Sequence, residues 1–181
     1  MSTQRQVALL RGVNVGRAKR IAMADLRTVL GDLGFTGVRT LLNSGNAVFD
    51  CPAADAAKSA ARIEETLVLK LGVPARVTVL DAQQLADIVA ANPLLDRARD
   101  PSRLMVAVLS NPADRGKLEA LAHQQWQPEA FALGQWAAYI WCVDGVLASR
   151  AAAAMGNLLG DAVTTRNWST ITKLHSLAME T

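Results

Sequence analysis

The residues best suited to binding chemistry form a basic, glycine-containing segment close to the N-terminus. The segment follows a short apolar run and consists of Arg11, Gly12, Asn14 and Gly16, with Arg17, Lys19 and Arg20 after it. Glycine lets backbone N–H groups approach a ligand closely, and an arginine donates in bidentate fashion to a carboxylate or a phosphate. The segment is therefore predicted to supply part of an anion-binding site. For the three basic residues after Gly16, solvation of a surface loop is an equally good interpretation.

A second polar group lies between two β-prone runs, 38–42 and 47–49. Its members are Asn43, Ser44, Gly45 and Asn46. All four are strong turn formers, so they predict a β-hairpin, and their amide and hydroxyl groups could also bind a ligand. Asn and Gly also occur in turns for a purely geometric reason, because both tolerate left-handed backbone.

A third group surrounds the start of the last predicted helix and consists of Thr165, Arg166, Asn167 and Lys173. The N-terminus of a helix presents unpaired N–H groups that attract anions. The alternative, which we favour, is that Asn167 is an ordinary N-cap. Lys173 lies one helical turn after Thr170 and could activate its hydroxyl, but such pairs are common on helix surfaces.

The elements that must position the first two groups lie within residues 1–80, in the order β-α-β-β-α-β. Apolar residues at spacings of three and four predict the helices, and β-prone runs predict the strands. The expected ranges are a strand over 7–11, a helix over 23–33, strands over 38–42 and 47–49, a helix over 54–71 and a strand over 76–80. This order is that of a ferredoxin-like unit.

In a ferredoxin-like unit the first and third strands are central neighbours and run antiparallel. The end of the first strand and the turn between the second and third strands therefore share one edge of the sheet. Arg11 and Asn14 are accordingly predicted to lie near residues 43–46, although Arg11 could instead pair with an acidic neighbour.

The second half repeats this order of elements without repeating any motif. Strands are expected over 104–109, 131–133, 136–142 and 163–166, with helices from Asn111-Pro112, over 151–159, and after Asn167. We predict an α+β fold of two tandem ferredoxin-like (βαββαβ) units with antiparallel sheets and a C-terminal helix. The expected division is a first unit at 1–80, a helix and linker at 81–102, and a second unit with the C-terminal helix at 103–181.

The composition, with 51% hydrophobic and 19% charged residues, is typical of a soluble globular protein. No apolar run approaches the roughly 20 residues that a membrane helix needs, so no membrane partner is expected. The N-terminus lacks the core of a signal peptide, which favours a cytoplasmic location. Two cysteines and two histidines, all far apart, predict buried thiols and no metal site, although a carboxylate-held magnesium stays open. No cofactor is identified, because the common nucleotide-binding fingerprints are missing.

Several of these motifs together resemble the bacterial domain-of-unknown-function family 1697. The matching residues are 8–16, Met23, Leu26, 33–35, 43–46, 48–49, 165–168 and 173–174. They lie near both ends of the chain, so the resemblance spans nearly all of it. The resemblance implies a small soluble α+β protein, and it brings no activity, substrate or catalytic residue with it.

Three functions follow from these observations. The first is binding of a small anionic ligand, phosphate or carboxylate, between residues 11–16 and 43–46. The second, less favoured, is nucleic-acid binding, for which one hairpin offers the aromatic residues Phe131, Trp136, Tyr139 and Trp141, although aromatic residues on strands more often belong to the core. The third is a protein-interaction or oligomerisation scaffold that uses an open sheet edge or the same hairpin. Whether the protein is an enzyme, and its oligomeric state, are not decided by the sequence.

Overall fold

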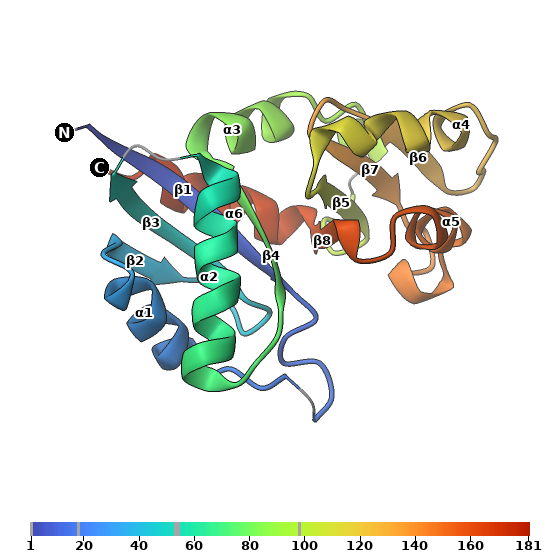
Figure 1. The fold of residues 1–181 in the computed structure, drawn as a ribbon. Coiled ribbons are helices and arrows are strands. Elements are labelled where there is room, and N and C mark those ends of the chain that lie inside the picture. The colour runs from blue at the N-terminus through green and yellow to red at the C-terminus, as the bar shows by residue number, and fades with distance from the viewer. Residues whose placement is uncertain (1, 18, 53–54, 98) are drawn as a thin grey trace. The chain divides into compact units, whose positions relative to one another are not determined.

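The computed structural model describes residues 2–17, 19–52, 55–97 and 99–181. In these residues the strands form two antiparallel sheets of four strands each, with helices packed against them (Figure 1). Both sheets have the strand arrangement of a ferredoxin-like unit, and the chain ends in a helix. The predicted α+β class, the two tandem units and the C-terminal helix are therefore confirmed.

The first sheet has the strand order β2-β3-β1-β4. Its strands are β1 (Thr3–Arg11), β2 (Thr36–Thr40), β3 (Asn46–Pro52) and β4 (Arg76–Asp81). β1 is central, since Val7 lies opposite Val48 of β3 on one side and opposite Leu80 of β4 on the other. β1 begins earlier than predicted, because its first residues are polar and become a strand only by pairing with β3.

Two helices cover one face of this sheet, α1 (Met23–Asp32) and α2 (Ala56–Leu71). Asp55 caps α2 by accepting a hydrogen bond from the Ala57 N–H at 2.8 Å. α2 ends at Gly72, which adopts a left-handed conformation with φ of 66°. The helices bury an apolar core in which the rings of Phe35 and Phe49 stack with centroids 4.5 Å apart. This core fixes the strands whose ends carry the first candidate site.

The second sheet has the order β6-β7-β5-β8, which is the order of the first sheet with β5 in the place of β1. Its strands are β5 (Leu104–Leu109), β6 (Ala130–Leu133), β7 (Ala137–Trp141) and β8 (Val163–Asn167). The remaining α-helices are α3 (Ala82–Ala90), α4 (Glu119–Ala122), α5 (Arg150–Leu159) and α6 (Trp168–Met179). Short 3₁₀ helices span Leu95–Arg97, Pro112–Leu118, Val146–Ala148 and Gly160–Ala162.

Side chains cap the helices α3 and α5, and one expected helix takes another form. Asp81 and Gln84 form a capping box at the start of α3, with side chain to backbone hydrogen bonds of 3.0 and 2.7 Å, and Ser149 caps α5 through the Ala152 N–H. The helix expected from Pro112 is instead a 3₁₀ helix followed by the single turn of α4. Gly116 lies within this short segment and disfavours a longer α-helix.

The chain divides into two compact units, one of Met1–Leu85 with Leu174–Thr181 and the other of Ala86–Lys173. The boundaries fall inside α3 and α6. The sequence-based division placed residues 81–102 between the units and the whole C-terminal helix in the second one. In the structure the end of α6 belongs to the first unit, because side chains of β1 and β2 bind it.

Both cysteines are buried free thiols, as expected. Burial raises the pKa of the Cys51 thiol and of the Cys142 thiol, so neither favours the reactive thiolate. Across the described part of the chain, no helix is long and apolar enough to span a membrane.

Candidate functional site

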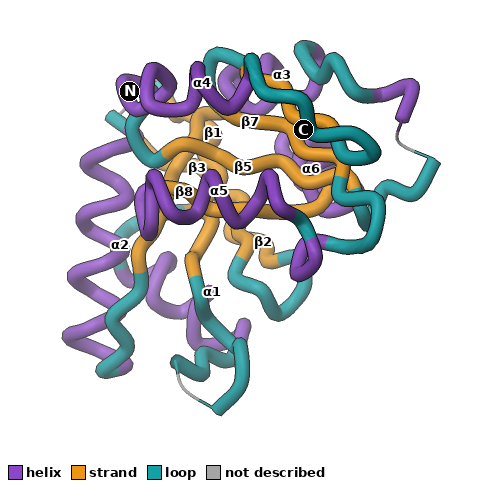
Figure 2. The backbone as a smooth tube through the Cα atoms, turned by 90° about the vertical axis from the view of Figure 1, so that its right-hand side faces the viewer, coloured by secondary structure: helices purple, strands orange, loops and turns teal. Residues whose placement is uncertain are grey.

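The segment after β1, residues 12–17 and 19–22, and the turn before β3, residues 41–45, meet at one edge of the first sheet. We call them the opening loop and the hairpin turn. Leu9 of β1 pairs with Asn46 of β3, and the Leu10 N–H donates to the Gly45 carbonyl at 2.8 Å. In addition, Asn14 Nδ2 donates to the Asn43 carbonyl at 2.6 Å. The predicted convergence is therefore confirmed, and Figures 1 and 2 both show the opening loop projecting beyond the ends of the strands.

Asn14 holds the opening loop in shape through hydrogen bonds of its side chain and its backbone. Its Nδ2 also donates to the Ile21 carbonyl at 2.8 Å, its Oδ1 accepts from the Ile21 N–H at 2.9 Å, and its own N–H donates to the Lys19 carbonyl at 3.0 Å. Its φ of 56° lies in the left-handed region, which asparagine tolerates better than most residues. Both polar atoms of this amide are engaged within the protein, so Asn14 shapes the edge and does not point at a ligand.

We predict that Asn14→Ala destabilises the protein by about 1–2 kcal/mol, because it removes these bonds and forces a left-handed alanine. Chemical denaturation measures the free energy of unfolding. Asn14→Gly is the matched variant, since it loses the same side chain and keeps the backbone freedom, and should be less destabilised. Equal stability of Asn14→Ala and the wild type would show that the hydrogen bonds of Asn14 do not stabilise the fold.

The hairpin turn is built by Asn46 and Gly45. Asn46 is fully buried, and its Nδ2 donates to the Leu41 carbonyl and to Ser44 Oγ, both at 2.8 Å. Gly45 has a φ of 89°, and a Cβ on it would lie 2.8 Å from Leu10 Cβ and from Val13 Cγ2. Only glycine therefore lets the turn approach the opening loop this closely. Asn43 and Ser44 are exposed on the surface, whereas Gly45 is buried.

Positive charge gathers on this edge. Arg11, Gly12 and Gly16 are exposed, as are Arg17, Lys19 and Arg20. Within the described residues, the side chains of those last three basic residues make no hydrogen bond or ion pair with the protein. Such cations are available to an outside anion.

Arg76, which motif reasoning missed, belongs to the same edge. It is the first residue of β4, it is exposed, and it lies directly opposite Arg11 in the antiparallel pairing of β1 with β4. The two like charges reinforce the positive potential of the edge. The strand order expected for a ferredoxin-like unit already placed the start of β4 beside the end of β1, so topology was the signal that could have found it.

The third candidate group consists of Thr165, Arg166, Asn167 and Lys173. It lies in the second unit, where β8 is followed by α6. Asn167 Oδ1 accepts from the Thr170 N–H at 2.8 Å, so Asn167 is the N-cap that we favoured. Arg166 is half-buried in β8, and its Nη1 donates to the neighbouring Thr165 carbonyl at 3.0 Å. Desolvation lowers its pKa to about 10, which leaves it charged at neutral pH. Thr165 itself is half-buried opposite Ala107 of β5.

The idea that Lys173 activates the Thr170 hydroxyl gains no support. Thr170 is buried and Lys173 is exposed. In the part of the chain that the structure describes, the Lys173 ammonium has no hydrogen-bond or ion-pair partner. The two residues share a helix without sharing a contact.

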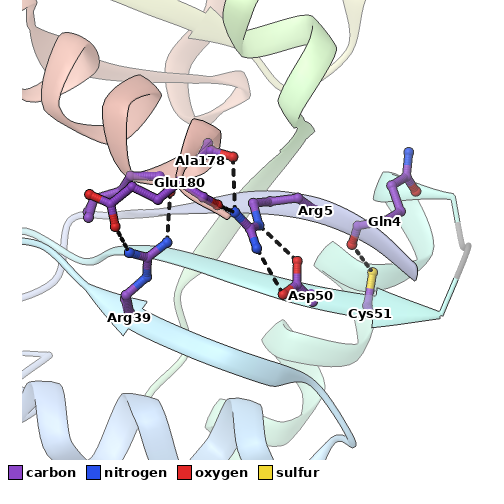
Figure 3. Close-up of polar contacts among 8 residues, drawn as sticks. Gln4, Arg5, Arg39, Asp50, Cys51, Ala178 and Glu180 are labelled. Atoms are coloured by element: carbon purple, nitrogen blue, oxygen red, sulfur yellow. Dashed lines mark hydrogen bonds and ion pairs between the residues drawn. The ribbon is translucent and has the colours of Figure 1, made fainter. Parts of the chain in front are cut away.

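A further polar cluster, not predicted from the sequence, holds the end of α6 against β1 and β2 (Figure 3). Arg5 donates to both carboxylate oxygens of Asp50, at 2.8 and 3.1 Å, and to the Ala178 and Glu180 carbonyls. Arg39 donates to the Leu177 carbonyl at 2.7 Å and pairs with the Glu180 carboxylate. These arginines satisfy carbonyl groups that the last turn of a helix leaves unpaired.

The electrostatics of this cluster suit a structural role. The hydrogen bonds from Arg5 are the main cause that holds the pKa of Asp50 below its ordinary value. A shallow surface pocket of about 310 Å³ adjoins the cluster, but its arginines are already bonded to protein oxygens. We therefore assign the cluster to anchoring the helix and not to binding a ligand. Nothing in the local sequence marks it, because its members are far apart along the chain.

Tyr139 is one of the aromatic residues that nucleic-acid binding would use, and it lies on β7 of the hairpin formed by β6 and β7. It is buried, with 1% of its surface exposed. Its hydroxyl donates to the Ile88 carbonyl at 2.6 Å, and burial raises its pKa to about 12. A ring held in this way cannot stack on a nucleic-acid base.

In the second unit a pocket of about 110 Å³ lies at the start of α5. Its buried Glu129 accepts from the Ser149 hydroxyl and from the Arg150 N–H, the latter at 2.9 Å. Ser149 Oγ in turn accepts from the Ala152 N–H at 3.0 Å. Glu129 and Ser149 therefore cap the helix.

Among the described residues no group of three or more His, Cys, Asp and Glu side chains is arranged to hold a metal ion.

Comparison with known proteins adds two findings. The model of the protein family described as "Protein of unknown function (DUF1697)" matches residues 3–139. A solved structure, that of the conserved bacterial protein SP0830 from Streptococcus pneumoniae, superimposes with a TM-score of 0.76 at 19% sequence identity, covering 98% of this chain and 99% of that one. At this identity the likeness concerns the fold alone. No curated protein matches the chain.

Proposed function

Because the chain belongs to the DUF1697 family, whose description gives no activity, we propose a function from the geometry of its own residues. The protein binds a small anionic ligand, carrying a phosphate or a carboxylate, at the edge formed by the opening loop and the hairpin turn. We place this activity in the cytoplasm.

The observation that carries the proposal is that the opening loop and the hairpin turn are joined at an edge where several exposed cations lie. The Asn14 to Asn43 hydrogen bond makes one continuous surface of the two loops. Arg11 and Arg76 lie opposite each other at its base, and further basic residues of the opening loop have no carboxylate partner among the described residues. Such a surface attracts anions from solution.

Each part of the edge has a distinct task. The Asn14 and Asn46 side chains shape the loops, and Gly45 allows their close approach. Gly12 and Gly16, both with positive φ, expose backbone N–H groups, while Arg11 offers a planar fork that matches a carboxylate or phosphate. No histidine or cysteine occurs in residues 11–22 or 41–46, so the proposal is one of binding, with no reaction assigned.

The test is a thermal-shift screen of nucleotides, sugar phosphates, inorganic phosphate and carboxylates, followed by titration of the best ligand. Arg11→Ala is expected to weaken binding at least tenfold, because it removes a charge-assisted hydrogen bond of about 1.5–3 kcal/mol. Arg97→Ala, which removes an exposed arginine of the other unit, is the matched control and should bind like the wild type. The proposal fails if no anion shifts the melting temperature, or if Arg11→Ala and Arg97→Ala bind equally.

A further inference from the structure

Two apolar side chains stand out on the basic edge because they face solvent. Val15 of the opening loop is 72% exposed and Leu42 of the hairpin turn is 53% exposed. Val15 follows Asn14 and Leu42 precedes Asn43, so the two lie one residue from either end of the hydrogen bond that joins the loops. The edge therefore presents an apolar pair as well as positive charge.

The backbone at Leu42 makes its side chain unexpected. Its φ of 60° is left-handed, a conformation that leucine adopts at a cost and asparagine adopts readily. Burial does not account for the choice of leucine, since about half of its surface is in solvent. An apolar residue thus occupies a turn position where local geometry favours a polar one.

The charged residues of the opening loop and the hairpin turn are all basic. Arg17, Lys19 and Arg20 lie within five residues of Val15 in the opening loop and are exposed, with no hydrogen bond or ion pair among the described residues. Both views of the chain show this loop extending past the strand ends (Figures 1 and 2). A projecting loop can bring its apolar side chains and its cations to a flat surface at the same time.

The sequence led us to expect no membrane partner, because no segment is long enough to span a bilayer, but docking on a bilayer surface needs no such segment. We propose that this edge docks on an anionic phospholipid surface. Val15 and Leu42 enter the interface between headgroups and acyl chains, and the basic residues of the opening loop contact lipid phosphates. The inference rests on the proposed function and names its ligand as the phosphate of a lipid headgroup. A free phosphate would use the cations alone and would leave the exposed apolar pair without a contact, so the apolar pair favours the lipid.

Co-sedimentation with phosphatidylcholine vesicles, with and without phosphatidylglycerol, tests the proposal. We expect binding only to vesicles that contain phosphatidylglycerol, with affinity falling as salt rises. Leu42→Asn and Val15→Ser should each weaken vesicle binding about tenfold. Lys19→Ala should weaken it about fivefold, the effect of one cation near an anionic surface. Leu42→Asn should fold normally, because asparagine accepts the left-handed backbone.

Leu147→Asn is the matched control, because Leu147 is fully exposed at 102% but belongs to the other unit. It should bind vesicles like the wild type. Vesicle binding that Leu42→Asn leaves unchanged, or that a single-stranded oligonucleotide equals, would overturn the lipid assignment. If inorganic phosphate shifts the melting temperature while vesicles do not bind, this inference falls and the proposed function stands. If neither binds, both fall.

Discussion

Replacing Gly45 with alanine is expected to destabilise the protein by about 3 kcal/mol, through overpacking together with a strained backbone. The added methyl group would lie 2.8 Å from both Leu10 Cβ and Val13 Cγ2, and both of these side chains are buried. The residue would also keep a φ of 89°, outside the range that alanine favours. Chemical denaturation of the wild type and the variant measures the difference.

Gly16→Ala separates the two contributions. Gly16 has a φ of 66°, but a Cβ on it would meet nothing within 4 Å. It should therefore show only the backbone cost of about 1 kcal/mol. Because the methyl group on Gly45 pushes the hairpin turn away from Val13, Gly45→Ala should also weaken anion binding more than Gly16→Ala does. Equal destabilisation of the two variants would mean that the loops do not pack as described.

The second large effect concerns the anchor of α6. Arg5→Ala is expected to destabilise the protein by about 2 kcal/mol, because it breaks a bidentate ion pair with Asp50 and removes the hydrogen bonds to the last carbonyl groups of α6. Both side chains of the pair are largely shielded, at 25% and 28% exposure, so solvent weakens their attraction less than on an open surface. Urea denaturation at neutral pH measures the loss.

The pH dependence of Asp50→Asn gives an independent check. The pKa of Asp50 is lowered in the folded protein, so its ionised form stabilises the fold above the unfolded carboxyl pKa of about 4. This stabilisation is lost as the pH falls through the folded value, and the difference between wild type and Asp50→Asn should shrink in acid. Asp32→Asn, which breaks the exposed pair with Lys70, is the control and should change stability little at either pH. A difference for Asp50→Asn that stays constant with pH would exclude this role.

Much of the candidate site followed from sequence patterns, because those patterns are local. Glycines and asparagines at 12–16 and 43–46 mark loops, and the periodicity of residues 1–80 gives an order of elements with few compatible topologies. From that topology the meeting of the opening loop and the hairpin turn could be predicted without any contact map. The same topology places Arg76, at the start of β4, beside Arg11 at the end of β1.

The tasks of individual residues could not be predicted in the same way. Asn14 and Asn46 were candidates for ligand binding because an amide both donates and accepts. In the structure these amides are engaged by protein carbonyl groups, and which carbonyl groups lie within reach depends on the final path of the loops. A residue type defines what a side chain can do, whereas its neighbours in space decide what it does.

The sequence by itself determined the fold class, the repeated order of elements and the position of the basic edge, since periodicity, turn formers and charge are properties of short segments. Only the tertiary structure decided that Gly45 packs on Val13, that the Tyr139 hydroxyl donates to the Ile88 carbonyl, and that Arg5 and Arg39 bind the end of α6. These contacts join residues far apart in the chain. They form when strands and helices bury their apolar faces together, and no local pattern records which distant residues that burial will bring into contact.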